Sequence, residues 1–208
     1  MRLGYPDLKT AKKIWQEGLD YRTKTTVFAN RNEYIFHTTG VASAARKIAE
    51  KTMYLNPEKA YVLGLLHDYG KKYDEFISRK FHAKTGYDEL FEKKYFNSAQ
   101  ICLTHSFPYK DFKNEDYKSY YPEWLDWARN TLKTVVYDEY DYLIQLCDCF
   151  FEGMNIVSFE KRFEGIMRRY NLSLKDINIQ IKGAERNKSY FDKICNMDVY
   201  ELLNINHL

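Results

Sequence analysis

The chain of 208 residues contains 45% hydrophobic and 29% charged residues, which is typical of a globular protein with a sizeable core. The net charge of only +3, with Lys and Glu interleaved, argues against a nucleic-acid-binding protein held by a dominant basic face. No apolar run reaches the length of a membrane span, and the N-terminal residues lack the apolar region of a secretory signal.

Helical periodicity runs through nearly the whole chain and predicts an all-α fold. In "FHTTGVASAARKIAEKTM", His37 falls on the apolar face of the first strongly predicted helix. In "NPEKAYVLGLLHDYGKK", Asn56 can cap the next helix and Pro57 suits its first turn. Gly70 is the expected C-terminal stop of that helix.

Four more helices are predicted in the rest of the chain. "NSAQICLTHSF" indicates a short helix from near Asn97 that carries His105. "DEYDYLIQLCDCFFEG" has acidic residues in its first turn and should end at Gly153. Two further helices are expected to begin near Ser158 and Ala184, and the strand signal is confined to short pieces such as "INIQI".

Residues 107–130, "FPYKDFKNEDYKSYYPEWLDWARN", differ from the helices around them. The segment is rich in aromatic residues and shows no clear periodicity before Pro122. We interpret it as a long insertion between two helices. It could be either a surface loop held by its aromatic side chains or a lid that faces a substrate.

Four of the five histidines and two aspartates are candidate metal ligands. His67 and Asp68 end an apolar helix, and Asp148 lies within "LIQLCDCFF" with no Lys or Arg within a helical turn. A buried carboxylate must be neutralised, paired or bound to a metal. Neighbouring helical residues point about 100° apart, so His67 and Asp68 cannot aim squarely at one point. Either they straddle one ion, or Asp68 bridges two ions and His82 and His105 supply further ligands.

The chemical type of these side chains narrows the metal. Histidine and aspartate suit iron, manganese, cobalt, nickel or zinc rather than calcium, and no thiolate is required. Cys147 and Cys149 flank Asp148 and would point away from its direction on a helix, so we interpret them as packing residues. Together with Cys102 and Cys195 they show no CxxC spacing, which predicts reduced thiols in a cytoplasmic protein.

The order of these residues resembles the HD superfamily of metal-dependent phosphohydrolases. The resemblance spans roughly residues 34–153 and depends on "FHTTGVASAARKIA", "LLHDYGK" and "LIQLCDCF". His82 in "FHAKTGYDEL" and His105 in "ICLTHSF" match the two additional histidines of binuclear members. Among these, the chain is most similar to the YqeK-type subgroup, whose members are di-iron hydrolases of diadenosine tetraphosphate.

The resemblance implies an HD-domain helical bundle over residues 1–153, with the insertion at about 107–130. Residues 154–208 would form a C-terminal helical extension packed on the same domain. The implied ligands of the first metal are His37, His67, Asp68 and Asp148. Asp68 would bridge to a second metal held by His82 and His105. Iron or manganese is expected, with zinc, cobalt and nickel as alternatives.

The implied activity is hydrolysis of a phosphate ester or anhydride, with a nucleotide as the expected substrate, by a metal-activated water. Asp68 and Lys71 are the predicted catalytic residues, and Lys71, Lys84 and Tyr109 the predicted substrate contacts. Two alternatives stay open: a di-iron oxygenase on the same scaffold, and a non-catalytic module that binds metal or nucleotide. We expect a monomer or homodimer that binds neither membrane nor nucleic acid.

Overall fold

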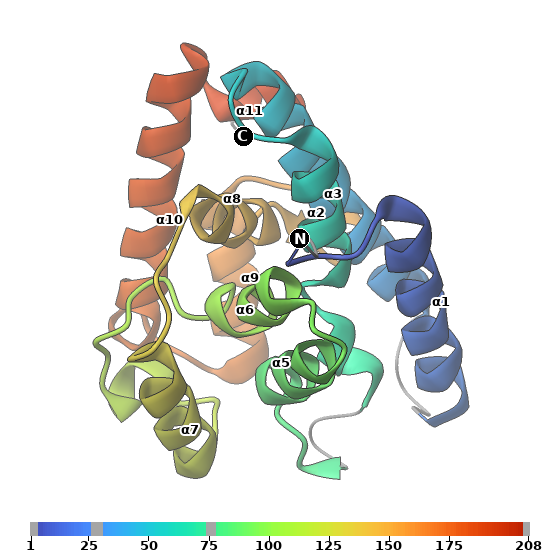
Figure 1. The fold of residues 1–208 in the computed structure, drawn as a ribbon. Helices are drawn as coiled ribbons and strands as arrows, with labels where there is room; N and C mark the ends of the chain where they lie inside the picture. The colour runs from blue at the N-terminus through green and yellow to red at the C-terminus, as the bar shows by residue number, and fades with distance from the viewer. Residues whose placement is uncertain (1–3, 26–30, 74–77, 206–208) are drawn as a thin grey trace.

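The computed structural model describes residues 4–25, 31–73 and 78–205, and these form an almost wholly helical molecule (Figure 1). The α-helices are α1 (Leu8–Thr25), α2 (Arg31–Thr52), α3 (Pro57–Leu66), α5 (His82–Glu92), α6 (Phe96–Thr104), α7 (Pro122–Leu132), α8 (Glu139–Asp148), α9 (Phe159–Tyr170), α10 (Leu174–Cys195) and α11 (Val199–Leu203). Two 3-10 turns, η1 (Tyr69–Lys72) and η2 (Asn114–Tyr117), and one hairpin, β1 (Phe151–Glu152) with β2 (Asn155–Ile156), complete the described elements. The all-α prediction is confirmed.

The main core lies where α8 is enclosed by α2 and α3 on one side and α10 on the other (Figure 1). Fully buried residues such as Ile48, Leu63, Phe150 and Phe191 fill it. Helices α2 and α3 lie close together because Gly64 has no side chain. A Cβ atom there would sit 2.8 Å from the Cα atom of Ala42.

Helix α3 begins as the sequence predicts. The side chain of Asn56 accepts a hydrogen bond from the Lys59 N–H at 3.0 Å, and Pro57 occupies the first turn. The predicted stop at Gly70 is wrong, because α3 ends at Leu66 and Gly70 lies within η1. Gly70 is required for packing instead, since a Cβ atom there would overlap the carbonyl of His82 at the start of α5.

Residues 107–130 fold around a second apolar core rather than forming an open loop. Phe107 is fully buried and stacks on Phe112, with ring centroids 5.0 Å apart. The expected insertion contains a helix of its own, α7, which begins at Pro122 and whose residues Trp124 and Leu125 join the same core. This second core packs beside α5 and α6, so the segment forms one wall of the site described below.

Of three element boundaries in the last third of the chain, two differ from the prediction and one agrees with it. Helix α8 ends at Asp148, and Gly153 lies in the hairpin turn with a φ of +58°, a conformation that favours glycine. Helix α9 begins after Ser158 as predicted. Helix α10 begins at Leu174, ten residues before the expected start at Ala184.

The "INIQI" piece lies inside α10 and is helical, so the strand signal there was wrong. The helix begins in a capping box, in which Asp176 accepts hydrogen bonds from the N–H and hydroxyl of Ser173 at 2.9 and 2.7 Å. Ile177 then packs into the main core. Burial of this face outweighs the weak preference of β-branched residues for strands.

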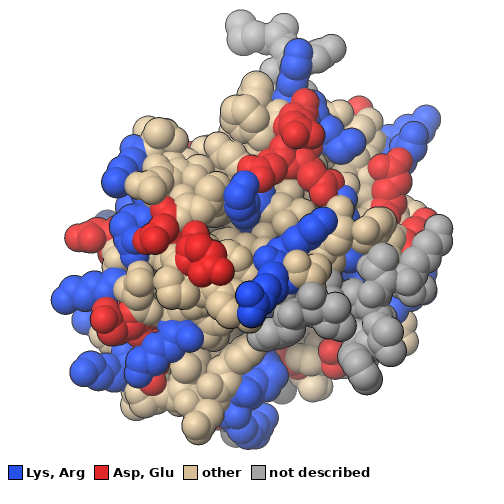
Figure 2. Space-filling view, turned by 90° about the horizontal axis from the view of Figure 1, so that it is seen from below, with Lys and Arg blue, Asp and Glu red and all other residues tan. Residues whose placement is uncertain are grey.

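No helix among the described residues is both long and apolar enough to cross a bilayer. Figure 2 shows the molecule from below, where Lys and Arg side chains alternate with Asp and Glu side chains over the visible face. The charges on that face therefore form no patch of a single sign.

Candidate metal centre

Six side chains from five parts of the chain lie close together between the helices. His37 comes from the second turn of α2, and Asp148 is the last residue of α8. The other four lie at helix termini, where the chain turns toward the same point: His67 follows α3, Asp68 precedes η1, His82 opens α5 and His105 follows α6.

The first group of side chains contains His37, His67 and Asp148. The Nε2 atoms of the two histidines are 3.1 Å apart. The Oδ1 atom of Asp148 lies 3.0 Å from Nε2 of His37 and 3.5 Å from Nε2 of His67. Three potential ligand atoms therefore surround one point.

The second group contains Asp68, His82 and His105. The Nε2 atoms of His82 and His105 are 3.3 Å apart, and both face Oδ1 of Asp68, at 3.9 and 3.4 Å. The other carboxylate oxygen, Oδ2, lies 3.3 Å from Nε2 of His37 and 3.4 Å from Nε2 of His67. Asp68 thus presents one oxygen to each group.

Backbone carbonyls orient two of the imidazole rings. Nδ1 of His67 lies 2.6 Å from the Gly64 carbonyl, and Nδ1 of His105 lies 2.9 Å from the Ile101 carbonyl. A carbonyl oxygen only accepts hydrogen bonds, so Nδ1 must carry the proton in both rings. Nε2 is the nitrogen left to bind a metal ion, and such carbonyl contacts are usual for histidine ligands.

The two carboxylates are ionised at neutral pH. Burial opposes the charge on Asp68, but Lys71 and His67 outweigh it and hold the pKa of the carboxyl well below its usual range. Burial also opposes the charge on Asp148, and hydrogen bonds from His37 and His67 lower the pKa of its carboxyl well below the usual range. Burial lowers the pKa of the His105 imidazole.

His67 shows how strongly this site favours positive charge. Burial alone would lower the pKa of the imidazole, but the carboxylates of Asp68 and Asp148 raise it to about 10. The site therefore provides concentrated negative charge that a cation must neutralise.

The ligand atoms have the spacing that transition metals require. Metal–nitrogen bonds of about 2.1 Å place neighbouring ligand atoms about 3.0–3.4 Å apart in octahedral or tetrahedral geometry. The distances within the first group lie within 0.1 Å of this range, and those within the second lie in it or up to about half an ångström beyond it. Oδ1 of Asp68 is buried and accepts no hydrogen bond from any residue that the structure describes. Such an atom is costly unless a cation binds it, so the residues fit two metal ions.

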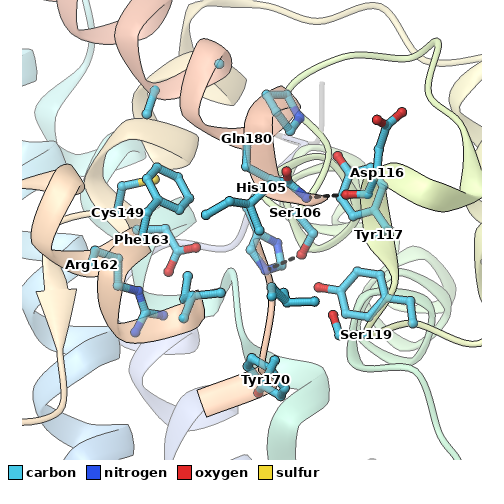
Figure 3. Close-up of a pocket in the computed structure, with 18 of the residues that line it drawn as sticks. His105, Ser106, Asp116, Tyr117, Ser119, Cys149, Arg162, Phe163, Tyr170 and Gln180 are labelled. Atoms are coloured by element: carbon cyan, nitrogen blue, oxygen red, sulfur yellow. Dashed lines mark hydrogen bonds between the residues drawn. The ribbon is translucent and has the colours of Figure 1, made fainter. Parts of the chain in front are cut away.

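An open cavity of about 210 Å³ adjoins the centre. His82, His105 and Asp148 form its floor. Figure 3 shows Arg162 and Phe163 on one side of the cavity and Tyr117 on the opposite side. The candidate metal centre is therefore accessible from an open cavity.

The three predicted substrate contacts lie in different places. Lys71 lines the cavity, and its Nζ atom donates to Oδ2 of Asp68 at 2.7 Å. Lys84 pairs with Asp88 on the same helix and does not line the cavity. Tyr109 is also outside the lining, with its ring beneath the guanidinium of Arg186.

Sequence reasoning missed two polar groups near the centre. The hydroxyl of Ser106 lies 3.1 Å from Nε2 of His105 and 3.4 Å from Nε2 of His82 (Figure 3). Its place directly after His105 was the only available signal. Arg162 comes from α9, beyond the region of the family resemblance, and no local pattern indicated that it would lie near Asp148.

The HD domain family model matches residues 34–150, which is more than half of the chain. The chain therefore belongs to the HD domain family. The family includes metal-dependent hydrolases, and all six side chains described above lie within the matched region. No curated protein and no solved structure matches the chain.

Proposed function

We propose that the protein is a binuclear metal-dependent phosphohydrolase that cleaves a phosphate ester or anhydride of a nucleotide. The observation that supports this most strongly is the position of Asp68. One of its carboxylate oxygens faces His37 and His67, and the other faces His82 and His105. A carboxylate shared in this way is suited to bridging two cations.

Two bound ions would activate a water molecule and offset the charge of the phosphoryl group. His37, His67 and Asp148 would hold one ion, His82 and His105 the other, and Asp68 both. The side chain of Lys71 is 35% exposed and lines the cavity at the edge of the same centre, where it would contact a phosphate oxygen as a point charge. The imidazoles of His67, His82 and His105 are buried, and the low dielectric constant of such surroundings strengthens these interactions.

The walls of the cavity support an organic phosphate as substrate rather than a small inorganic one. On the side of α9 and α10 the lining includes the apolar residues Phe163, Ile166, Leu172 and Ile177 among polar and charged ones, while Tyr117, Tyr120 and Trp124 border the opposite side. Flat aromatic side chains and apolar walls suit a nucleobase, which stacks and excludes water.

The proposal includes the YqeK-type subgroup as the nearest functional class and iron or manganese as the metals. Histidine and carboxylate ligands without thiolates suit these ions. The division of six ligands into two groups that share Asp68 supports the binuclear arrangement that this subgroup implies.

The test is elemental analysis of protein purified without chelator. Wild type should retain about two equivalents of metal, His105→Ala about one, and Asp68→Ala close to none. Lys84→Ala is the control, because this residue lies on the same helix as His82 but outside the cavity. Phosphate release from nucleotides should require the metal and fall at least about 100-fold in Asp68→Ala.

Three other outcomes would refute parts of the proposal. One equivalent of metal in the wild type would leave His82 and His105 as substrate or acid–base groups. Bound iron with oxygen consumption and no phosphate release would favour a di-iron oxygenase. No bound metal, and no activity after metal addition, would favour a non-catalytic binding module.

A further inference from the structure

Arg162 lies in the first turn of α9, outside the segment that carries the metal ligands. Its side chain lines the cavity together with Asp148 and Cys149. Figure 3 shows Arg162 and Cys149 in this lining. The side chain is 18% exposed, so most of it is held by the protein while one edge borders the cavity. A cation is thereby placed beside the metal centre by the C-terminal part of the chain.

The position of this guanidinium is fixed by Glu152. Nη1 of Arg162 donates to Oε2 of Glu152 at 2.6 Å, and Arg169 donates to both oxygens of the same carboxylate. Helix α9 can approach Glu152 because Gly165 has no side chain, and a Cβ atom there would overlap the carboxylate. Hydrogen bonds from two arginines therefore hold the Glu152 carboxylate in place.

The guanidinium of Arg162 has unused hydrogen-bonding capacity. Among the described residues, Glu152 is the only side-chain hydrogen-bond partner of Arg162, and it occupies one of the five N–H donors. The two arginines carry one more positive charge than Glu152 neutralises. Burial opposes the charge on Arg162, but the carboxylates of Asp148 and Glu152 raise the pKa of the guanidinium, which stays charged.

We propose that Arg162 binds a non-bridging oxygen of the phosphoryl group held at the metal centre. The inference rests on the proposed function, since it requires a phosphorylated substrate at that site. A guanidinium fork can give one edge to Glu152 and a second edge to a phosphate, which a lysine ammonium cannot match. Arg162 and Lys71 then contact the phosphoryl group from different elements, α9 and η1.

This role also gives the C-terminal helices a function. The metal ligands all precede residue 149, yet the proposed phosphate contact comes from α9, which follows the hairpin. The site would be incomplete without this part of the chain.

The experiment is titration calorimetry of inorganic phosphate into the metal-loaded protein, alongside elemental analysis and kcat and KM on a nucleotide. The variants are Arg162→Met and Arg162→Lys, with Arg168→Met as the matched control. Arg168 is an exposed arginine on the same helix that does not line the cavity, so the control removes the same charge and side chain.

Arg162→Met should weaken phosphate binding by about tenfold or more, because a charge-assisted hydrogen bond is lost. Arg162→Lys should lose less, and Arg168→Met should stay within about twofold of the wild type because exposed charges are screened. Metal content should be unchanged in all three, since none of these residues is a ligand. If Arg162→Met fails to fold, Arg162→Lys decides, because it keeps a cation beside Glu152.

Wild-type phosphate affinity in both Arg162 variants, with the metal retained, would overturn the inference and leave Arg162 as an ion-pair partner of Glu152. In that case hydrolysis of a phosphate ester or anhydride by the wild type would still support the proposed function. If the metal-loaded wild type neither binds phosphate nor hydrolyses any phosphate compound, both proposals fail together.

Discussion

Asp141→Asn tests how α6 and α8, which carry His105 and Asp148, are held together. The Asp141 carboxyl is fully buried on α8. It accepts hydrogen bonds from the Thr104 hydroxyl at 2.5 Å and the Gln100 amide at 2.8 Å, both on α6. Burial raises the pKa of this carboxyl from its ordinary 3.8 to about 6.

The raised pKa sets the sign of the effect. The folded state holds a proton on Asp141 more tightly than the unfolded state does. The resulting stabilisation is complete below pH 3.8 and is lost as the pH rises through 6. A pKa difference of about 2.2 corresponds to about 3 kcal/mol over the whole range, of which about 1.4 kcal/mol falls between pH 5 and pH 8.

Urea unfolding of wild type and Asp141→Asn at pH 5, 6, 7 and 8, in chelator, measures this difference. The chelator prevents metal binding from adding its own pH dependence. The free energy of unfolding of the wild type should fall by about 1.4 kcal/mol relative to the variant between pH 5 and pH 8. Other titrating groups are common to both proteins and cancel.

Asp198→Asn is the matched control. Burial opposes ionisation of Asp198, but hydrogen bonds from Lys188 and the Tyr200 N–H outweigh it and lower the pKa of the carboxyl. The stabilisation by ionised Asp198 is lost only as the pH falls below the ordinary carboxyl pKa of 3.8. The difference in unfolding free energy between wild type and Asp198→Asn should therefore be constant between pH 5 and pH 8. A constant difference for Asp141→Asn as well, or one that rises with pH, would refute the argument.

Three further substitutions test the packing that positions the centre. Gly70→Ala should cost about 1–3 kcal/mol in urea unfolding and reduce metal content, because the new methyl group displaces the start of α5; full metal content would contradict this. Phe107→Ala, in the second core, should cost about 3–5 kcal/mol, whereas the exposed Val136→Ala should change unfolding by less than about 0.5 kcal/mol. Asn56→Ala should lower the free energy of unfolding by about 1 kcal/mol through loss of the α3 cap, and equal stability would show that the cap is dispensable.

Features that depend on neighbouring residues were predictable from the sequence. The caps at Asn56 and Ser158 and the start of α7 at Pro122 follow from local hydrogen bonding and fixed backbone angles. The candidate ligands were also predictable as residues, because carboxylates within apolar helices require a compensating charge. Asp68 and Asp148 could therefore be singled out without knowing what lies beside them.

Features that depend on contacts between distant segments could not be read from local patterns. The role of Gly70 is decided by the carbonyl of His82 on another helix, not by the end of its own. The "INIQI" piece is helical because Ile177 faces the main core, and this burial outweighs local propensity.

By itself, then, the sequence determined the family, the helical class and the set of candidate ligands, because ligand chemistry and helix periodicity are written in residue types and short spacings. The tertiary structure alone decided that Asp68 faces two groups of histidines and that Arg162 reaches the same cavity. Both depend on how helices far apart in the chain pack, and that packing is set by the shapes of two cores rather than by any local pattern.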